Sequence, residues 1–477
     1  MTADSKQKWA ALALILFGGI FLIALDFNIV NVSIPAIRAG LHANFAEVDL
    51  VLAAYGIAFA VALITGSRLG DLFGRKRVLL IGEAVFACAS LACGLSPSPF
   101  FLIIARVFQG LGAALMLPQV LSLIQIMFQG KERQLAISFF GMTIGLGNIC
   151  GNIIGGALAQ ANLFGLEWRP IFLLNLPVII LVSPLIWKWV TESRAQSCVK
   201  LDLIGAGLIS VAIGLLIYPL AMGRQENWPF YMWIFLAAGA VLLFIFTRYE
   251  KIKSDRHESP LIEISIFYNK KFTLGLLVGF FFFLIILATL LLLTLYMQMG
   301  LHFDERKTGL MFSPFGAAFL IASLLSSKLV QKLGKYIVHL GTTIMMIGII
   351  WLIVQSRRQG ADITTASILI GLITYGTGQG FTQPPLLGLI LSGIKNSELV
   401  GSASGILSTV QQMSMSLGIA VIGTIYFTFV GSNFSTNHYV EAFGNTLFVI
   451  LGLLGLTFLL AFALPSEKTV KPANHSI

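Results

Sequence analysis

Long apolar segments separated by short polar ones run through almost the whole chain. Most of the apolar segments are about 20 residues long, which is the length that a helix needs to cross a bilayer. The pattern therefore predicts fourteen membrane-spanning helices. We expect them at residues 9–32, 47–66, 78–95, 99–121, 135–159, 170–190, 203–222, 231–248, 272–298, 308–329, 336–355, 364–391, 400–429 and 444–464.

The composition agrees with an all-α integral membrane protein. Of the 477 residues, 57% are hydrophobic and 11% are charged, which excludes an ordinary soluble protein. The net charge of +10 would suggest nucleic-acid binding if it were clustered in a soluble domain, but the lysines and arginines are spread over the predicted loops. We expect no nucleic-acid partner.

The positions of the basic residues predict the orientation in the membrane. If both termini are cytoplasmic, most of the 31 lysines and arginines lie on the cytoplasmic side, as the positive-inside rule requires. The apolar segment that follows Lys6 and Lys8 is too long for a signal peptide, so we expect an uncleaved first span. The expected location is the inner cell membrane.

No residue pattern indicates a metal, a cofactor or a catalytic site. The four cysteines and six histidines lack metal-ligand spacing, and the sequence contains no G-x-x-x-x-G-K-[ST] phosphate-binding loop. A membrane enzyme or sensor should also show an interfacial cluster of His, Asp and Glu, and none is visible. We therefore expect no enzyme activity, no cofactor and no built-in ATPase.

A short basic turn, SRLGDLFGRKR at 67–77, separates two apolar segments. By itself it could simply keep this loop on the cytoplasmic side. It also resembles the G-x-L-x-D-x-x-G-R-K/R-R loop of the major facilitator superfamily. Ser67 replaces the first glycine, which predicts a slightly looser helix contact there. The resemblance implies a latch that holds one conformation, formed by Asp71, Gly74, Arg75 and Arg77.

A repeat at an offset of 260 residues supports this resemblance: SKLVQKLGK at 327–335 aligns with SRLGDLFGR at 67–75. Two parallel six-helix bundles are the major facilitator fold. Two extra central helices resemble the fourteen-span drug:proton antiporter branch. The expected domains are an N-terminal six-helix bundle at 1–190, two additional helices at 191–250, a cytoplasmic interfacial linker at 251–271, a C-terminal six-helix bundle at 272–464 and a cytoplasmic tail at 465–477.

Charged residues inside a span are costly and often functional, and three of them stand out: Asp26, Glu83 and Arg106. Asp26 in LDFNIVNVSIP and Arg106 in RVFQGLGAALMLP resemble the helix-1 and helix-4 motifs of the antiporter branch. Both lie about 8–11 Å below the outer surface at roughly 1.5 Å per residue, so they can couple. A change in their separation would load or release a proton, whereas a permanent ion pair is the alternative.

Glu83 lies about five residues into the third predicted span and matches no family motif. It is a candidate for a second proton site or for a partner of the basic turn. A carboxylate in a wet vestibule is the alternative that we favour slightly.

Closely spaced glycines mark the fifth predicted helix. GNICGNIIGG at 147–156 resembles the helix-5 signature of the antiporters, with Asn152 in place of its proline. Such spacing predicts a groove against which another helix packs closely. The helix-packing residues are Gly147, Gly151, Gly155 and Gly156. WRPIFLLNLP at 168–177 is similar to the opening of helix 6 in the same branch.

The resemblance implies a proton-coupled secondary transporter that exports small amphipathic or cationic compounds by alternating access. An exporter of an endogenous metabolite such as a siderophore, or an importer, would use the same scaffold. The expected partners are a small-molecule substrate, protons and the lipid bilayer, and a monomer could feed an envelope-spanning efflux assembly. Weaker candidates for substrate contacts, which ordinary helix packing explains equally well, are Asn28, Asn31, Tyr55, Phe59, Gln109 and Gln411.

Overall fold

The described part of the chain is built of helices. The computed structural model describes residues 3–43, 45–161, 165–194, 202–223, 226, 228–256, 261, 264–303, 305–394, 399–431 and 436–464. These residues form helices and no β-strand, as the apolar pattern predicts. The expected tail at 465–477 lies outside the described residues.

The first half of the chain begins with a long helix that has a π-helical segment in its middle. The elements of this half are α1 (Ala3–Ile15), η1 (Leu16–Phe21), α2 (Leu22–Val32), α3 (Ile34–Leu41), α4 (Phe45–Phe73), α5 (Arg75–Gly94), α6 (Pro99–Met127), α7 (Gly130–Ala161), α8 (Pro170–Leu173) and α9 (Asn175–Trp189).

Two helices and a short 3₁₀ segment then lead into the second half. These are α10 (Leu203–Met222), α11 (Phe230–Asp255) and η3 (Ile264–Tyr268). The second half consists of α12 (Lys270–Leu295), η4 (Tyr296–Gly300), α13 (Glu305–Leu333), α14 (Tyr336–Gln359), η5 (Gly360–Asp362), α15 (Thr365–Ser392), α16 (Val400–Val430) and α17 (Thr436–Ala461).

Helix ends follow local sequence signals. Ser98 caps α6, because its side chain accepts a hydrogen bond from the backbone N–H of Phe101 and Pro99 occupies the first helical position. Asn269 caps α12 in the same manner. Gly74 separates α4 from α5 with φ of 104°, a conformation that favours glycine.

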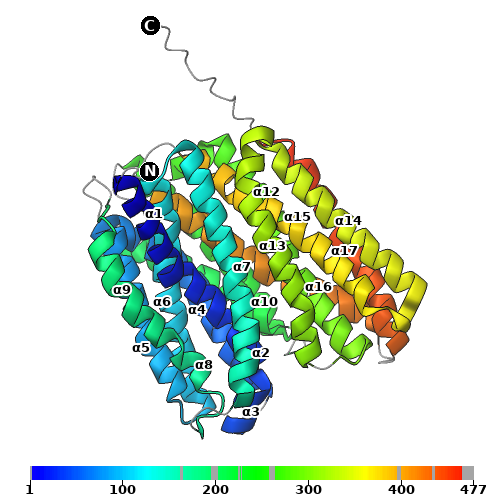
Figure 1. Cartoon of the computed structure of the whole chain (residues 1–477). Coiled ribbons are helices and arrows are strands. Elements are labelled where there is room, and N and C mark those ends of the chain that lie inside the picture. Colours follow the sequence, from blue (N-terminus) through cyan, green and yellow to red (C-terminus); the bar gives the residue numbers. More distant parts are fainter. Residues whose placement is uncertain are drawn as a thin grey trace.

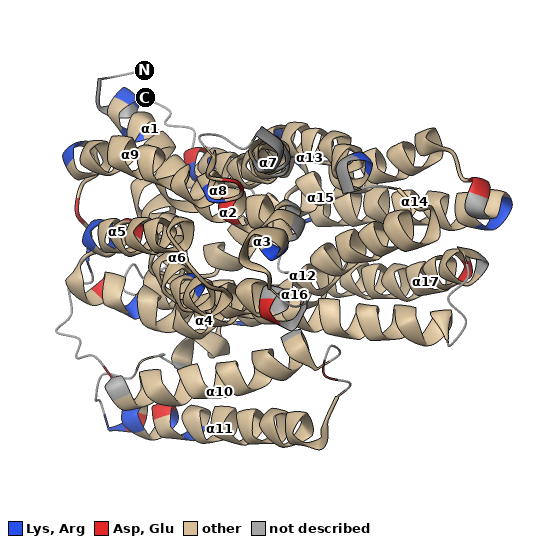
Figure 2. Ribbon diagram, turned by 90° about the horizontal axis from the view of Figure 1, so that it is seen from below, with Lys and Arg blue, Asp and Glu red and all other residues tan. Residues whose placement is uncertain are grey.

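The helices form two groups that lie side by side (Figure 1). Helix α7 of the first group packs against α13 of the second, and α4 packs against α16. Helices α10 and α11 lie together at one edge, where α10 contacts α4 and α16 (Figure 2). The two groups therefore meet along α4, α7, α13 and α16, and α10 and α11 lie outside them.

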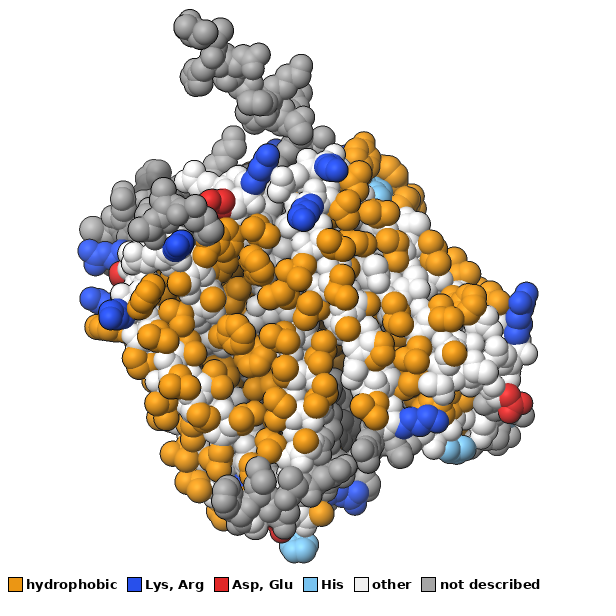
Figure 3. Space-filling view, viewed as in Figure 1, with side chains coloured by type: hydrophobic (Ala, Val, Ile, Leu, Met, Phe, Trp, Pro, Cys, Tyr) orange, Lys and Arg blue, Asp and Glu red, His pale blue; other side chains and the backbone are white. Residues whose placement is uncertain are grey.

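The surface is that of a membrane protein. Hydrophobic side chains cover the middle of the face in Figure 3, and most of the visible lysines and arginines lie near its edges. Twelve helices within the described residues are long and apolar enough to cross a membrane. Helix α10 has a shorter apolar stretch, Ile204–Leu220, and α15 carries a central segment rich in Gly and Gln. The count of fourteen spans therefore stays a prediction.

Asp202 fastens the beginning of α10 to the end of α11. Its carboxylate accepts hydrogen bonds from the N–H of Gly205 at 2.9 Å and the hydroxyl of Tyr249 at 3.1 Å, and it pairs with Lys253 at 2.8 Å. Burial alone would raise the pKa of Asp202. The hydrogen bonds from Gly205 and Lys253 outweigh burial and hold the pKa below its ordinary value.

We expect Asp202→Ala to lower the unfolding temperature of the purified protein at pH 7, because α10 and α11 lose this connection. A carboxyl group with a lowered pKa stabilises the fold above its ordinary pKa, and that contribution is lost as the pH falls through the lowered value. The difference from wild type should therefore shrink below about pH 4. Asp255→Ala, which removes an exposed carboxylate from α11, is the control. Equal unfolding temperatures of Asp202→Ala and wild type at pH 7 would contradict the prediction.

Candidate functional site

A buried ion pair joins α2 to α6 in the first half. Nη1 of Arg106 lies 2.5 Å from Oδ2 of Asp26, and the two side chains are 1% and 0% exposed. The sequence places these residues at one depth, and the structure places them in direct contact. Removing one partner of such a pair leaves an uncompensated buried charge, which costs roughly 3–5 kcal/mol. Their role in proton coupling stays a prediction.

Neutral side chains from three helices complete the site. Oδ1 of Asp26 accepts hydrogen bonds from Gln109 at 2.7 Å and from Asn175 at 3.1 Å. Both amides also donate to the hydroxyl of Ser90, at 2.9 and 3.2 Å. The carboxylate therefore has three donors around it, supplied by α6 and α9 and supported by α5. We call Asp26, Arg106, Gln109, Asn175 and Ser90 the Asp26 network.

Arg106 also donates to Oε1 of Gln109 at 2.8 Å, and its other contacts are to α4 and to aromatic rings. Its Nε donates to the carbonyl oxygen of Val51 at 3.3 Å, and its guanidinium lies 4.2 Å from the centre of the Tyr55 ring. Tyr55 in turn stacks on Phe59. The sequence suggested Tyr55 and Phe59 as substrate contacts, but the structure buries both and directs Tyr55 toward Arg106.

Glu83 on α5 lies apart from the Asp26 network. Its side chain is 0% exposed, and it accepts a hydrogen bond from the hydroxyl of Ser183 on α9. A Cβ added to Gly18 of η1 would collide with its other oxygen. The expectation of a carboxylate in a wet vestibule was wrong, because α5 turns Glu83 toward the π-helical segment and α9 rather than toward water. A role as a second proton site is untested.

The basic turn contacts the second half. Asp71 pairs with Arg75 at 2.6 Å, and both are buried. The carboxylate of Asp71 occupies the place that a Cβ on Gly401 would need. Gly401 is the second residue of α16, where the helix terminus favours a negative charge. Ser67 donates a hydrogen bond to the carbonyl oxygen of Gly401, so replacing the family glycine does not loosen the contact.

Glu192, which could not be predicted from the sequence pattern, also binds the basic turn. Its carboxylate accepts hydrogen bonds from the backbone N–H groups of Lys76 and Arg77, each at 3.1 Å. The Arg77 side chain itself is 67% exposed and lies 3.9 Å from Glu192. A carboxylate at the beginning of α5 satisfies N–H groups that a helix leaves unpaired. This cap connects the segment after α9 to the latch residues.

We expect Asp71→Asn to slow turnover far more than it weakens substrate binding, because Asp71 contacts α16 and is expected to latch one conformation rather than to touch the substrate. A shift in conformational equilibrium of roughly 1–3 kcal/mol is sufficient for such an effect. Turnover and binding affinity should be measured separately on protein in liposomes. Gln331→Ala changes the exposed residue at the repeat-related position and is the matched control. An equal loss of turnover in both variants would show that the latch is not confined to the first half.

The glycines of α7 face α2 at very short range. A Cβ on Gly151 would lie 2.7 Å from the carbonyl oxygen of Leu25, and one on Gly155 would lie 3.0 Å from that of Ile29. A Cβ on Gly147 would lie 2.7 Å from the Cβ of Ala24. Helix α7 runs unbroken from Gly130 to Ala161. The surroundings of Gly156 lie outside what the structure describes.

A cavity of about 490 Å³ lies between the two halves. It is at the end of the bundle opposite the basic turn, between the last part of α2 and the first part of α13. The candidates Asn28 and Asn31 line it, but Gln109 and Gln411 do not. Asn28 donates to Asn148 at 2.9 Å across this wall. The polar residues that line the cavity are Asn28, Asn31, Asn148, Thr294, Gln298, Thr308 and Ser313.

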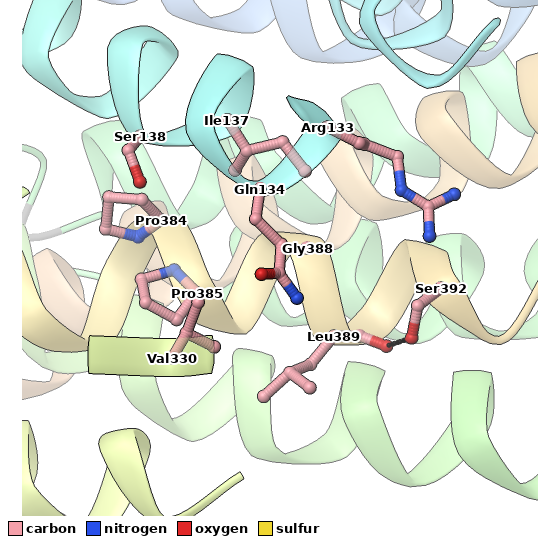
Figure 4. A pocket seen from close by; sticks show the side chains of 10 residues that line it. All are labelled: Arg133, Gln134, Ile137, Ser138, Val330, Pro384, Pro385, Gly388, Leu389 and Ser392. Carbon is pink, nitrogen blue, oxygen red and sulfur yellow. Dashed lines mark hydrogen bonds between the residues drawn. The ribbon is translucent and has the colours of Figure 1, made fainter. Parts of the chain in front are cut away.

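The halves are closed at the end that carries the basic turn. Ser138 of α7 lies 3.2 Å from the hydroxyl of Ser326, and its carbonyl oxygen accepts a hydrogen bond from Ser323 at 3.0 Å. Figure 4 shows Ser138 beside Pro384 and Pro385 of α15, around a space of about 30 Å³. The structure is thus closed on this side and hollow on the other.

The described residues contain no group of three or more His, Cys, Asp and Glu side chains that could hold a metal ion.

Comparisons with known proteins agree on one family. The sequence model of the Major Facilitator Superfamily matches residues 16–208 and 202–419. The probable actinorhodin transporter of Streptomyces coelicolor is 35% identical over 427 residues, 89% of this chain and 74% of that protein. Multidrug resistance protein Stp of Mycobacterium tuberculosis is 33% identical over 410 residues, 85% of this chain and 74% of that protein. The solved proton:xylose symporter XylE is similar in fold, with a TM-score of 0.70, 16% identity and 97% coverage of each chain.

Proposed function

Because the chain belongs to the major facilitator superfamily and is a multi-pass membrane transporter, we propose that it is a proton-coupled exporter of small amphipathic compounds. The observation that carries the proposal is the buried contact of Arg106 with Asp26, because Asp26 belongs to α2, a helix that also lines the cavity. The names of the relatives, a multidrug resistance protein and an antibiotic transporter, support export.

In this proposal the chain has fourteen spans, with α10 and α15 included, and both termini are cytoplasmic. Residues 1–190 and 272–464 are the two six-helix bundles, 191–250 holds the additional pair, and 251–271 is a cytoplasmic linker. The distribution of basic residues supports this orientation. The basic turn and the closed end of the bundle then face the cytoplasm, and the cavity faces outward.

The Asp26 network supplies the coupling step. The carboxyl group of Asp26 contacts one cation, Arg106, and two amide donors, Gln109 and Asn175. A proton that reaches Asp26 removes the negative charge that holds Arg106 and weakens the contact between α2 and α6. Asn28, two residues further along α2, lines the cavity. Protonation at Asp26 can therefore change the cavity wall through the same helix.

The latch supplies the conformational step. Contacts of Ser67 and Asp71 with Gly401 hold α4 against α16 at the closed end. They must break before the two bundles can rock apart on this side and admit cargo. The interface between α4 and α16 is thus either formed or broken, and switching between these two arrangements gives alternating access.

Growth of an efflux-deficient host on a panel of toxic compounds tests the function. Cells that make the wild-type protein should tolerate at least one amphipathic compound better than cells that make Asp26→Asn at the same membrane level. Greater sensitivity of the wild-type cells would indicate import. Equal growth on every compound would overturn multidrug export.

A second candidate is export of a single compound that the host itself makes. The relative that is 35% identical carries the name of one antibiotic rather than of many. Accumulation of one endogenous compound in cells lacking the protein would favour this candidate over multidrug export.

A further inference from the structure

We propose that the central cavity selects uncharged compounds that combine an aromatic ring with hydrogen-bonding groups, and that it discriminates against permanent cations. This inference rests on the proposed export function and chooses between the amphipathic and cationic substrates that the sequence leaves open. It is carried by the chemistry of the cavity wall, whose described residues supply amides, hydroxyls and aromatic rings but no ionised side chain.

No residue that lines the cavity within the described part of the chain is Asp, Glu, Lys, Arg or His. A permanent cation that left water for this space would lose hydration and would gain no counter-ion from these described wall residues, which is strongly unfavourable. A neutral compound of the same size avoids that penalty and still buries its apolar surface. The volume of about 490 Å³ lies in the usual range for drug-sized ligands.

The two embedded acids do not supply the missing negative charge. Asp26 is next to the wall residue Phe27 in sequence, but its carboxylate faces away from the cavity and is neutralised by Arg106. Glu83 lies between Ser183 and η1. An ion pair acts on a distant cation only as a dipole, so the field of Asp26 in the cavity is small.

The polar groups of the wall offer both acceptors and donors to a neutral ligand. Nδ2 of Asn28 is engaged by the carbonyl oxygen of Ala24 and by Asn148, which leaves Oδ1 of Asn28 as an acceptor. Because Oδ1 of Asn148 receives that bond, its Nδ2 group is oriented as a donor. Asn31 is arranged like Asn28. Its Nδ2 donates to the carbonyl oxygen of Phe27, which leaves its Oδ1 as an acceptor for a ligand.

The apolar part of the wall suits a flat ring. Phe27 comes from the first half, and Phe312 and Phe315 come from α13 of the second half. Rings from both halves can therefore sandwich an aromatic ligand, while the amides of α2 and α7 bind its carbonyl, amide or hydroxyl groups. Such a ligand contacts both halves, as alternating access requires.

Two fluorescent probes of one scaffold test the inference. Dansyl amide is neutral at pH 7 and carries an aromatic ring with a sulfonamide. Dansyl aminoethyl-trimethylammonium adds a permanent positive charge to the same scaffold. Binding to the full-length protein in liposomes is followed by dansyl fluorescence, and export by loss of probe from energised vesicles. The wild type should bind the neutral probe at least about tenfold more tightly than the cation.

Gln298→Glu adds a carboxylate to the cavity wall with almost no change in shape. It should raise affinity for the cationic probe at least about tenfold and leave affinity for the neutral probe within about threefold. Gln129→Glu adds the same charge at an exposed position outside the cavity and should leave both affinities unchanged. Asn148→Ala adds no charge and should weaken the neutral probe alone.

The outcomes separate this inference from the export function. Tighter binding of the cation to the wild type, or no binding of the neutral probe, would overturn the neutral selectivity while export by the growth test could still hold. Selective binding of the neutral probe without any export would support the cavity assignment and contradict the export function. Equal effects of Gln298→Glu and Gln129→Glu would show that the cavity is not where the cation binds.

Discussion

Replacing Gly151 by leucine is expected to abolish transport while the protein still inserts into the membrane. There is no room on this face of α7 even for a Cβ, since it would lie 2.7 Å from the carbonyl oxygen of Leu25 and 2.8 Å from the Cβ of Asn28. A leucine side chain has to push α2 away from α7. Overpacking of this kind costs typically about 1–3 kcal/mol, and more where the obstacle is backbone.

The displacement also moves functional groups, because α2 carries Asp26 and the cavity residue Asn28. Transport should be measured in vesicles after membrane insertion has been verified, with Gly452→Leu as the matched control. Gly452 lies at an exposed position on α17, and no described atom lies within 4 Å of the place that its Cβ would take. Full transport by inserted Gly151→Leu would show that α2 and α7 do not need this close approach.

The apolar pattern was sufficient to place the long helices, because the bilayer fixes their length and composition. Helix α6 begins at the predicted residue, Pro99, since Ser98 and Pro99 form a cap that can be recognised locally. The π-helical segment η1 could not be predicted, because LFGGIF is as apolar as the helix around it. Hydropathy does not distinguish one helical hydrogen-bond pattern from another.

The candidate site was only partly predictable for a related reason. Depth along a helix follows from residue number, so Asp26 and Arg106 could be matched. Rotation about the helix axis does not follow from an apolar sequence, and Glu83 was therefore assigned to the wrong surroundings. Asn175 and Ser90 were missed because a single neutral polar residue in an apolar segment gives little signal. Glu192 was missed because its partners are backbone N–H groups.

Asp26→Asn is expected to eliminate transport driven by a pH gradient and to preserve substrate binding. The substitution keeps nearly the same shape but leaves a side chain that cannot release or accept the coupling proton. Glu83→Gln is the matched control, because it neutralises the other embedded acid, which lies outside the Asp26 network. Gradient-driven transport by Glu83→Gln should continue.

In Asp26→Asn, Arg106 remains buried without its counter-ion, which destabilises the fold independently of any effect on proton coupling. The double variant Asp26→Asn/Arg106→Gln removes both charges and restores neutrality. It should unfold close to the wild-type temperature and bind substrate if the pair has no further structural role. The double variant therefore separates an ion pair that only stabilises the fold from a carboxylate that carries a proton.

The decisive measurement is gradient-driven transport in proteoliposomes by the wild type, Asp26→Asn and Asp26→Asn/Arg106→Gln. We predict that only the wild type concentrates substrate when a pH gradient is imposed, although the double variant is folded and binds substrate. Recovery of gradient-driven transport in the double variant would contradict proton coupling through Asp26 and would make Asp26 and Arg106 a structural ion pair. Retention of transport by Asp26→Asn alone would likewise move the search for the proton site to Glu83.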